Sequence, residues 1–244
     1  MRYAILSDIH SNLEALYAVR QKLQTMRIDK ILCLGDIVGY NADPALCIQW
    51  VNDNASCIVR GNHDKAVFNM FHEKRFNHYA RDAIRWTRKV LSGNEKTCLK
   101  TLTEGPKEEP EGIVLCHGTP FDEDAYLHSP ESAEESFTFL DENMPNSWIC
   151  FFGHTHVPVV IDDQDHLILT EKPVTLSRSK RYLINPGSVG QPRDEDCRAS
   201  FGVLDDEKNS FELVRVPYNI EETQRKILMK GLPEVLASRL SVGR

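Results

Sequence analysis

Short apolar runs alternate with helical patterns in the first third of the chain, and this alternation constrains the fold more than any other feature. Apolar runs at 3–6, 31–34 and 58–59 are separated by a helical pattern over 13–26 and by a second helix that opens at Asp43-Pro44. Such a β-α-β-α-β order is typical of a largely parallel sheet covered by helices. The sequence therefore predicts an α/β fold.

Strand patterns dominate the rest of the chain, after a charged helical region at about 77–102 and a polar stretch at 104–112. We predict a helical tail at 219–240 and strands at 113–116, 148–152, 166–169, 182–184, 200–204 and 211–216. This order suits two sheets that pack face to face with helices outside. At 244 residues, we expect one domain over 1–244.

Charge and hydropathy limit the classes of partner. The formal net charge is -7 and the acidic residues are spread along the chain, which argues against a nucleic-acid partner because no broad cationic surface results. No apolar run approaches the roughly 18 residues of a membrane span, and the chain opens on a strand pattern rather than a signal peptide. We therefore expect a cytoplasmic protein without a membrane partner, while its oligomeric state stays open.

The cysteine pattern argues against a thiolate zinc site, because the seven cysteines include no CxxC pair. Four of them lie in or beside predicted strands, which favours buried free thiols: Cys33, Cys57, Cys116 and Cys150.

Side chains suited to metal binding follow the predicted strands, each a few residues after an apolar run ends. Sites in α/β sheets form beyond the carboxyl ends of the strands, where separate loops converge. We therefore expect these side chains to meet. They are Asp8, His10, Asp36, Asn62, His117, His154 and His156, and His63 lies next to Asn62 without being an expected ligand. In the D-x-H and H-x-H pairs, an extended backbone would direct residues i and i+2 to the same side.

Several of these residues have a simpler explanation when taken singly. The D-x-H at 8–10 is equally compatible with a polar loop, and Asp36 with an ordinary strand-to-helix turn. For His117 alone, a hydrogen-bonded histidine at a strand end is the favoured interpretation. The motifs Gly61-Asn62-His63-Asp64 and Gly153-His154-Thr155-His156 are more specific, since turn chemistry gives no reason for their histidines.

The remaining histidines lie outside this arrangement. We interpret His72, His78 and His166 as surface or helix residues and leave His128 open, because it lies in the polar loop 118–130. That loop is expected to contribute to substrate selection. Arg193 is a candidate phosphate contact, although a solvated surface arginine is the simpler interpretation.

Taken together, the blocks D-x-H, G-D, G-N-H-[DE], H and G-H-x-H resemble those of the calcineurin-like metallophosphoesterase superfamily. The resemblance spans residues 8–156, and Asn185-Pro186-Gly187-Ser188 looks like the turn that follows in its small bacterial phosphodiesterase branch. It implies a four-layer αββα sandwich with two packed mixed β-sheets flanked by helices. It also implies that Asp36 bridges two metals, one held by Asp8, His10 and His156 and the other by Asn62, His117 and His154.

Such a ligand set implies a particular chemistry. Mixed nitrogen and oxygen donors suit manganese, iron, zinc or nickel, and the sequence does not choose among these divalent metals. Two ions roughly 3.5–4 Å apart can hold a hydroxide between them and clamp the oxygens of an in-line displacement. The sequence thus predicts hydrolysis of small phosphodiesters or phosphomonoesters.

His63 is the candidate general acid, because imidazole suits proton transfer near neutral pH. The resemblance departs from the Ser/Thr phosphoprotein phosphatases, which carry an Asp and an Arg after G-D-x-V where this chain has Gly39 and Tyr40. The carboxylate that orients their histidine is missing at that position, which argues against a phosphoprotein substrate. Asp64 or a later residue would have to support His63 instead.

Two alternatives share the fold. A retromer scaffold subunit uses it in protein assembly, but lacks the complete ligand set that this sequence carries. A nuclease of the same superfamily would share the chemistry but would need a surface that binds a nucleic-acid strand.

Overall fold

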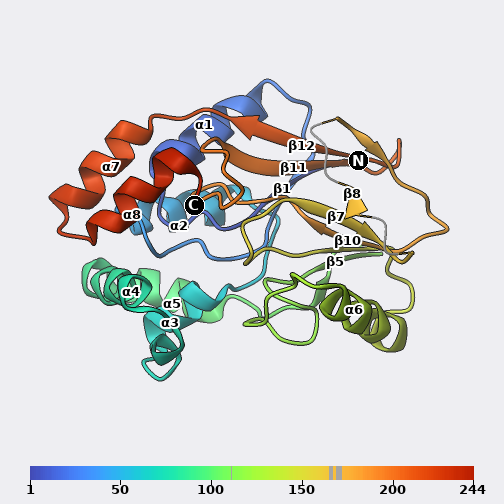
Figure 1. Ribbon diagram of the computed structural model, residues 1–244, viewed down its shortest axis with the longest axis horizontal. Coiled ribbons are helices and arrows are strands. Elements are labelled where there is room, and N and C mark those ends of the chain that lie inside the picture. Colours follow the sequence, from blue (N-terminus) through green and yellow to red (C-terminus); the bar gives the residue numbers. More distant parts are fainter. Residues whose placement is uncertain (111, 165–166, 169–171) are drawn as a thin grey trace.

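Two facing mixed sheets of six strands each form the centre of the protein in the computed structural model, which describes residues 1–110, 112–164, 167–168 and 172–244 (Figure 1). In the first sheet, three parallel strands lead into antiparallel ones. Its order is β3 (Cys57–Ile58), β2 (Lys30–Cys33), β1 (Arg2–Leu6), β11 (Ala199–Asp205), β12 (Ser210–Val216) and β9 (Val174–Thr175).

The second sheet is also mixed, with parallel pairing at its centre. Its order is β4 (Lys107–Glu108), β5 (Ile113–Leu115), β6 (Ile149–Phe151), β10 (Tyr182–Asn185), β7 (Val159–Asp162) and β8 (Leu167–Ile168). Buried side chains of both sheets, such as Ile5 and Phe151, form one apolar cluster between them. Because each strand alternates its side chains, the opposite faces must be covered by other elements.

Helices cover both outer faces. Helices α1 (Leu13–Gln24) and α2 (Pro44–Asn54) pack Leu16 and Val51 against the first sheet. Helix α6 (Pro130–Asn143) packs Leu140 against the second sheet. The four-layer αββα sandwich expected from the sequence is confirmed.

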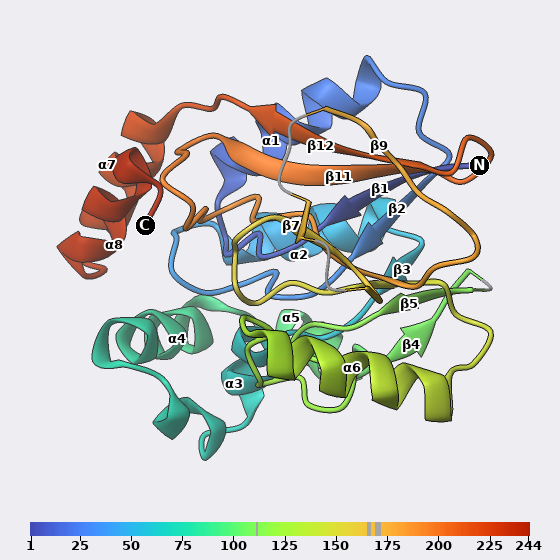
Figure 2. The same ribbon diagram turned by 45° about the vertical axis from the view of Figure 1, so that its right-hand side comes forward.

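Helices α4, α7 and α8 lie at one end of the sandwich (Figures 1 and 2). Helices α4, α7 and α8 share a buried cluster there with Tyr40, through residues such as Ala83, Ile227 and Leu236. Their bounds, with those of their neighbours, are α3 (Asn62–Phe68), η1 (His72–Arg75), α4 (His78–Val90), α5 (Gly93–Thr101), α7 (Ile220–Met229), α8 (Glu234–Ser238) and η2 (Arg239–Val242).

The structure corrects the predicted elements in several places. The region 77–102 is two helices, because Leu91 is extended and Ser92 starts α5 with a capping box. The stretch 104–112 contains β4, which the sequence reading missed. Helices α3 and α6 were also missed, although Ser129 and Pro130 are a typical helix start. Of the strand predicted at 166–169, only Leu167–Ile168 lie within the described residues, and they form β8.

All seven cysteines lie among the described residues and are free, as expected, and the four named above are buried. No helix in the described part of the chain has both the length and the apolar character needed to cross a membrane.

Candidate metal centre

The predicted ligands lie just beyond the carboxyl ends of parallel strands. Asp8 follows β1, Asp36 follows β2, His117 follows β5 and His154 follows β6. Since these strands run in the same direction within each sheet, their following loops converge at one end of the sandwich. All eight candidate side chains are buried there, including His63.

The backbone at five of these positions is left-handed rather than extended. The φ angles of Asp8, His10 and Asp36 are 53°, 49° and 51°, and those of His154 and His156 are 65° and 61°. The side chains therefore do not converge through strand alternation, and that expectation was wrong. A non-glycine residue in this region costs about 1–3 kcal/mol, and such strain is typical of functional sites.

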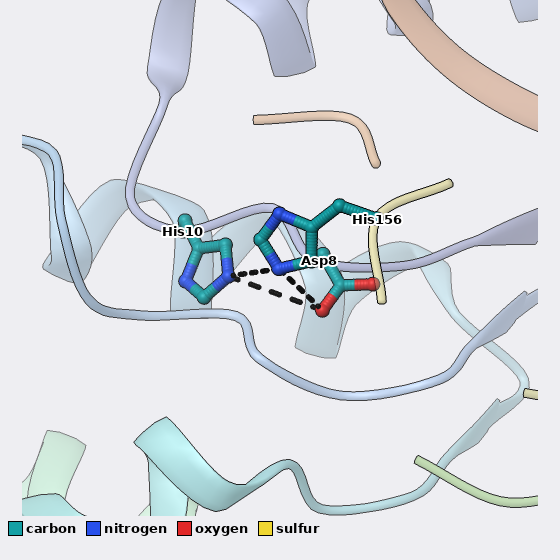
Figure 3. Close-up of side chains that lie close together, drawn as sticks. All are labelled: Asp8, His10 and His156. Atoms are coloured by element: carbon teal, nitrogen blue, oxygen red, sulfur yellow. Dashed lines mark hydrogen bonds and ion pairs between the residues drawn. The ribbon is translucent and has the colours of Figure 1, made fainter. Parts of the chain in front are cut away.

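The first group of donors consists of Asp8, His10 and His156, whose donor atoms point at one another (Figure 3). The Nε2 atoms of His10 and His156 are 3.1 Å apart. Asp8 Oδ1 lies 3.2 Å from the Nε2 of His156 and 3.9 Å from that of His10. These are the three residues that the resemblance assigns to one metal.

The other ring nitrogen of each histidine is held by a backbone carbonyl. The Nδ1 of His10 donates to Val38 O at 3.0 Å, and that of His156 donates to Gln191 O at 2.6 Å. Because a carbonyl only accepts, Nδ1 carries the proton and each neutral ring turns an Nε2 lone pair inward. Two lone pairs at 3.1 Å repel each other, so this donor set fits a cation.

The second group contains Asp36, His117 and His154, with Asn62 beside them. His117 Nδ1 donates to Leu34 O at 2.8 Å, and its Nε2 lies 3.4 Å from Asp36 Oδ2 and 3.1 Å from Asn62 Oδ1. The Nε2 of His154 is buried and has no partner among the described residues. A metal at this position would give that atom a partner.

Asp36 lies between the two groups. Its Oδ2 is 3.5 Å from His10 Nε2 and 3.4 Å from His117 Nε2, while its Oδ1 accepts the backbone N–H of His63 at 2.8 Å. This position fits the bridging role that the resemblance implies, which stays a prediction.

The electrostatics of the histidines suit metal binding. Burial lowers the pKa of His10 well below its ordinary value and that of His154 to about 3, so both rings are neutral at pH 7. Burial also disfavours the charged form of His117, but the carboxylates of Asp36 and Asp8 outweigh it and raise its pKa to about 10. A divalent cation beside Asp36 would compete with that proton.

His63 lies beside the two groups of candidate metal donors, and no carboxylate among the described residues accepts a hydrogen bond from its Nδ1 to orient the ring. Its Nδ1 is buried and has no partner in the described part of the chain. Asp64 does not support it, because its carboxylate accepts the backbone N–H groups of Val38 and Gly61, each at 3.1 Å.

Aromatic rings hold His63 instead. The ring centroids of Tyr40 and Phe76 lie 4.5 and 4.6 Å from that of His63, and His10 lies at 4.7 Å. A side chain at Gly39 would collide with His63 Nδ1, so glycine is needed there. The donor atoms of His10, Asp36 and His63 also lie within 4.8 Å of one another, so position alone does not separate His63 from the ligands.

A cavity of about 280 Å³ opens beside the two groups. Five of the candidate residues line it, and the others that line it come from the segment after β2, η1, the start of α4, the loop 118–130 and the segment after β10. The lining residues are Asp36, Tyr40, Asn62, His63, His72, Arg75, Phe76, Asn77, Ala80, Asp124, Tyr126, His154, His156 and Arg193.

His72 and the loop 118–130 have clear positions relative to this cavity. His72, interpreted as a surface or helix residue, does lie in the short helix η1, but it is buried rather than at the surface, and its Nε2 lies 3.0 Å from Asp124 Oδ1. Tyr126 stacks on His154 with ring centroids 4.0 Å apart. His78 and His128 are exposed, and His166 lies outside the described residues.

The turn at 185–188 braces the centre, a role that sequence reasoning had not assigned. Asn185 Nδ2 donates to Gly153 O at 2.8 Å, and Ser188 Oγ donates to Asp8 O at 2.8 Å. The motif therefore ties the two ligand loops together across the sheets.

Comparisons with known proteins find similarity over most or all of the chain. A family model described as "Calcineurin-like phosphoesterase superfamily domain" matches residues 1–209. An uncharacterized protein from Methanocaldococcus jannaschii is 39% identical over 244 residues, which cover 99% of this chain and 98% of that protein.

Two solved structures are similar over the full length. The metallophosphoesterase from Sphaerobacter thermophilus is 35% identical with a TM-score of 0.87, and the similarity covers 100% of both chains. A hypothetical protein from Pyrococcus horikoshii shares the fold, with a TM-score of 0.80 at 19% identity over 100% of this chain and 98% of that one.

Proposed function

Because the chain belongs to the calcineurin-like phosphoesterase superfamily, we propose that it is a metal-dependent hydrolase of small phosphodiesters or phosphomonoesters. The observation that carries the proposal is the inward orientation of the buried imidazole Nε2 atoms around Asp36, with the Nδ1 atoms of His10, His117 and His156 held by carbonyls. This donor set is compatible with manganese, iron, zinc or nickel.

The candidate ligands would be divided between two metal ions. Asp8, His10 and His156 would hold one divalent ion, Asn62, His117 and His154 the other, and Asp36 would contact both. Bound ions would supply Lewis acidity, which activates water and stabilises charge on the phosphoryl group. In the reaction, a water oxygen bonds to phosphorus, the ester P–O bond breaks, and the leaving oxygen takes up a proton.

Reconstitution tests this function. Protein stripped of metal should hydrolyse an aryl phosphodiester, an aryl phosphomonoester and nucleotides at least about 100-fold more slowly than protein reloaded with its preferred divalent ion. Elemental analysis should find close to two ions per chain after reloading. Protein that binds no metal and turns over none of these esters would favour the scaffold alternative.

His63 would donate the proton to the leaving oxygen. Burial lowers its pKa to about 4, outweighing the nearby carboxylate of Asp36, so the ring alone is neutral at pH 7. A bound phosphoester anion in the cavity would favour the imidazolium. The acid role therefore depends on substrate being present.

Replacing His63 by Ala should retain the metals and slow hydrolysis of esters with poor leaving groups about 100-fold or more. Esters of p-nitrophenol should be much less affected, since that oxygen leaves without a proton. The comparison requires kcat for both ester types and the metal content of each variant. The matched control is His78→Ala, an exposed histidine at the start of α4. Loss of metal from the His63 variant would refute the acid role.

A further inference from the structure

Arg193 reaches the cavity from the segment after β10. Its Nη2 donates to the Tyr40 hydroxyl at 3.2 Å and to Gln191 Oε1 at 3.4 Å, and its guanidinium carbon lies 5.9 Å from the Tyr40 ring centroid. It lines the cavity together with His63 and His156. The interpretation as a solvated surface arginine is therefore wrong.

The charge of Arg193 has no carboxylate partner among the residues that the structure describes. Its Nε is buried and makes no hydrogen bond to the described residues. Two other arginines differ in this respect, because Arg215 pairs with Asp194 and Arg88 pairs with Glu73. An unpaired and partly buried cation is costly, so a position that retains one is suited to an anion from outside.

Arg239 adds a second positive charge beside Tyr40. Its guanidinium carbon lies 5.7 Å from the Tyr40 ring centroid, and its Nε donates to the backbone carbonyl of Arg244. No Asp or Glu side chain pairs with it within the described part of the chain. Burial and the charge of Arg193 both lower the pKa of Arg239, so the two cations act on the same region.

We propose that Arg193, with Arg239 behind it, binds a doubly charged terminal phosphate and makes phosphomonoesters the preferred substrates over phosphodiesters. The inference rests on the proposed function and names its substrate class. A diester carries one negative charge, whereas a monoester carries roughly −1.5 to −2 at pH 7. A guanidinium can bind two phosphate oxygens at once through two parallel N–H donors. The Nε of Arg193, whose N–H is free, can be one of these two donors.

The test compares a monoester and a diester that share the p-nitrophenol leaving group, using the metal-loaded full chain. Wild-type protein should have the higher kcat/KM for the monoester. Arg193→Gln should lower kcat/KM for the monoester about 10- to 100-fold and for the diester only a few-fold. Arg193→Lys keeps the positive charge but loses the paired N–H donors of the guanidinium. Its kcat/KM for the monoester should fall between those of wild type and Arg193→Gln. The matched control is Arg225→Gln, an exposed arginine on α7, which should leave both values unchanged.

Binding of inorganic phosphate gives a readout that does not depend on turnover. Calorimetric titration of stripped and of metal-loaded protein should show a Kd about 10-fold weaker in Arg193→Gln than in wild type. Unchanged phosphate binding, or an equal loss for monoester and diester, would overturn the inference. If wild type hydrolyses neither ester with any metal, the proposed function fails, while the phosphate titration still decides the role of Arg193.

Folding of the variants is checked by their Tm. If Arg193→Gln does not fold, Tyr40→Phe carries the test, because it removes the hydroxyl that positions the guanidinium. It should weaken phosphate binding about 3-fold and reduce the preference for the monoester. Wild-type phosphate affinity in a folded Tyr40→Phe variant, with Arg193→Lys also unchanged, would refute the proposal.

Discussion

Replacing Asp36 by Asn is expected to reduce metal-dependent phosphoester hydrolysis by about 1000-fold or more. The Asp36 carboxylate lies between both groups of donors, 3.5 Å from His10 Nε2 and 3.4 Å from His117 Nε2. Asparagine has nearly the same shape and can still accept the His63 N–H, so the fold should survive. The negative charge that would attract both ions is lost, however. Steady-state kinetics at saturating metal, together with elemental analysis, measure the effect.

The matched control is Asp53→Asn, which removes an exposed carboxylate from α2 and should leave turnover unchanged. A folded Asp36→Asn protein with wild-type turnover would contradict the bridging role and with it the proposed metal centre.

Replacing Gly61 by Ala is expected to disrupt the same metal centre by steric collision alone. A Cβ at Gly61 would collide with the Oδ1 and the backbone N of Asp36. The backbone angles of Gly61, φ -92° and ψ 169°, are open to any residue, so strain at residue 61 itself does not contribute. Asp36 and the start of α3 would have to move apart. We expect hydrolysis to fall at least about 100-fold and the free energy of unfolding to fall by about 1–3 kcal/mol.

Gly93→Ala is the matched control, because a Cβ at Gly93 would meet nothing within 4 Å. Gly93 starts α5, where alanine is the better helix former, so stability should be equal or slightly higher and activity unchanged. Urea unfolding and kinetics of both variants decide the point. If the two alanines have the same effect, the packing of Gly61 against Asp36 is not what positions the carboxylate.

Local patterns predicted much of the fold because the spacing of apolar residues differs between strands and helices and can be recognised in the sequence. The runs that became β1, β2, β5 and β6 could be located in this way, and so could the positions of the ligands just behind them. Elements that carry residues of the candidate site were harder to recognise. Helix α3 starts at Asn62 and carries His63, and it was missed because its polar residues conceal the helical pattern.

The identity and order of the candidate ligands are fixed by the sequence, since residue types and their places after strands can be read without any structure. Only the tertiary structure decides how they are used. The left-handed backbone at His154 and His156 sends these neighbours to different groups, and carbonyls of Leu34, Val38 and Gln191 fix which ring nitrogen faces inward. Likewise, Arg193 meets Tyr40 across 153 positions of sequence. Such contacts join segments that are distant along the chain, and a local pattern of apolar and polar residues cannot predict them.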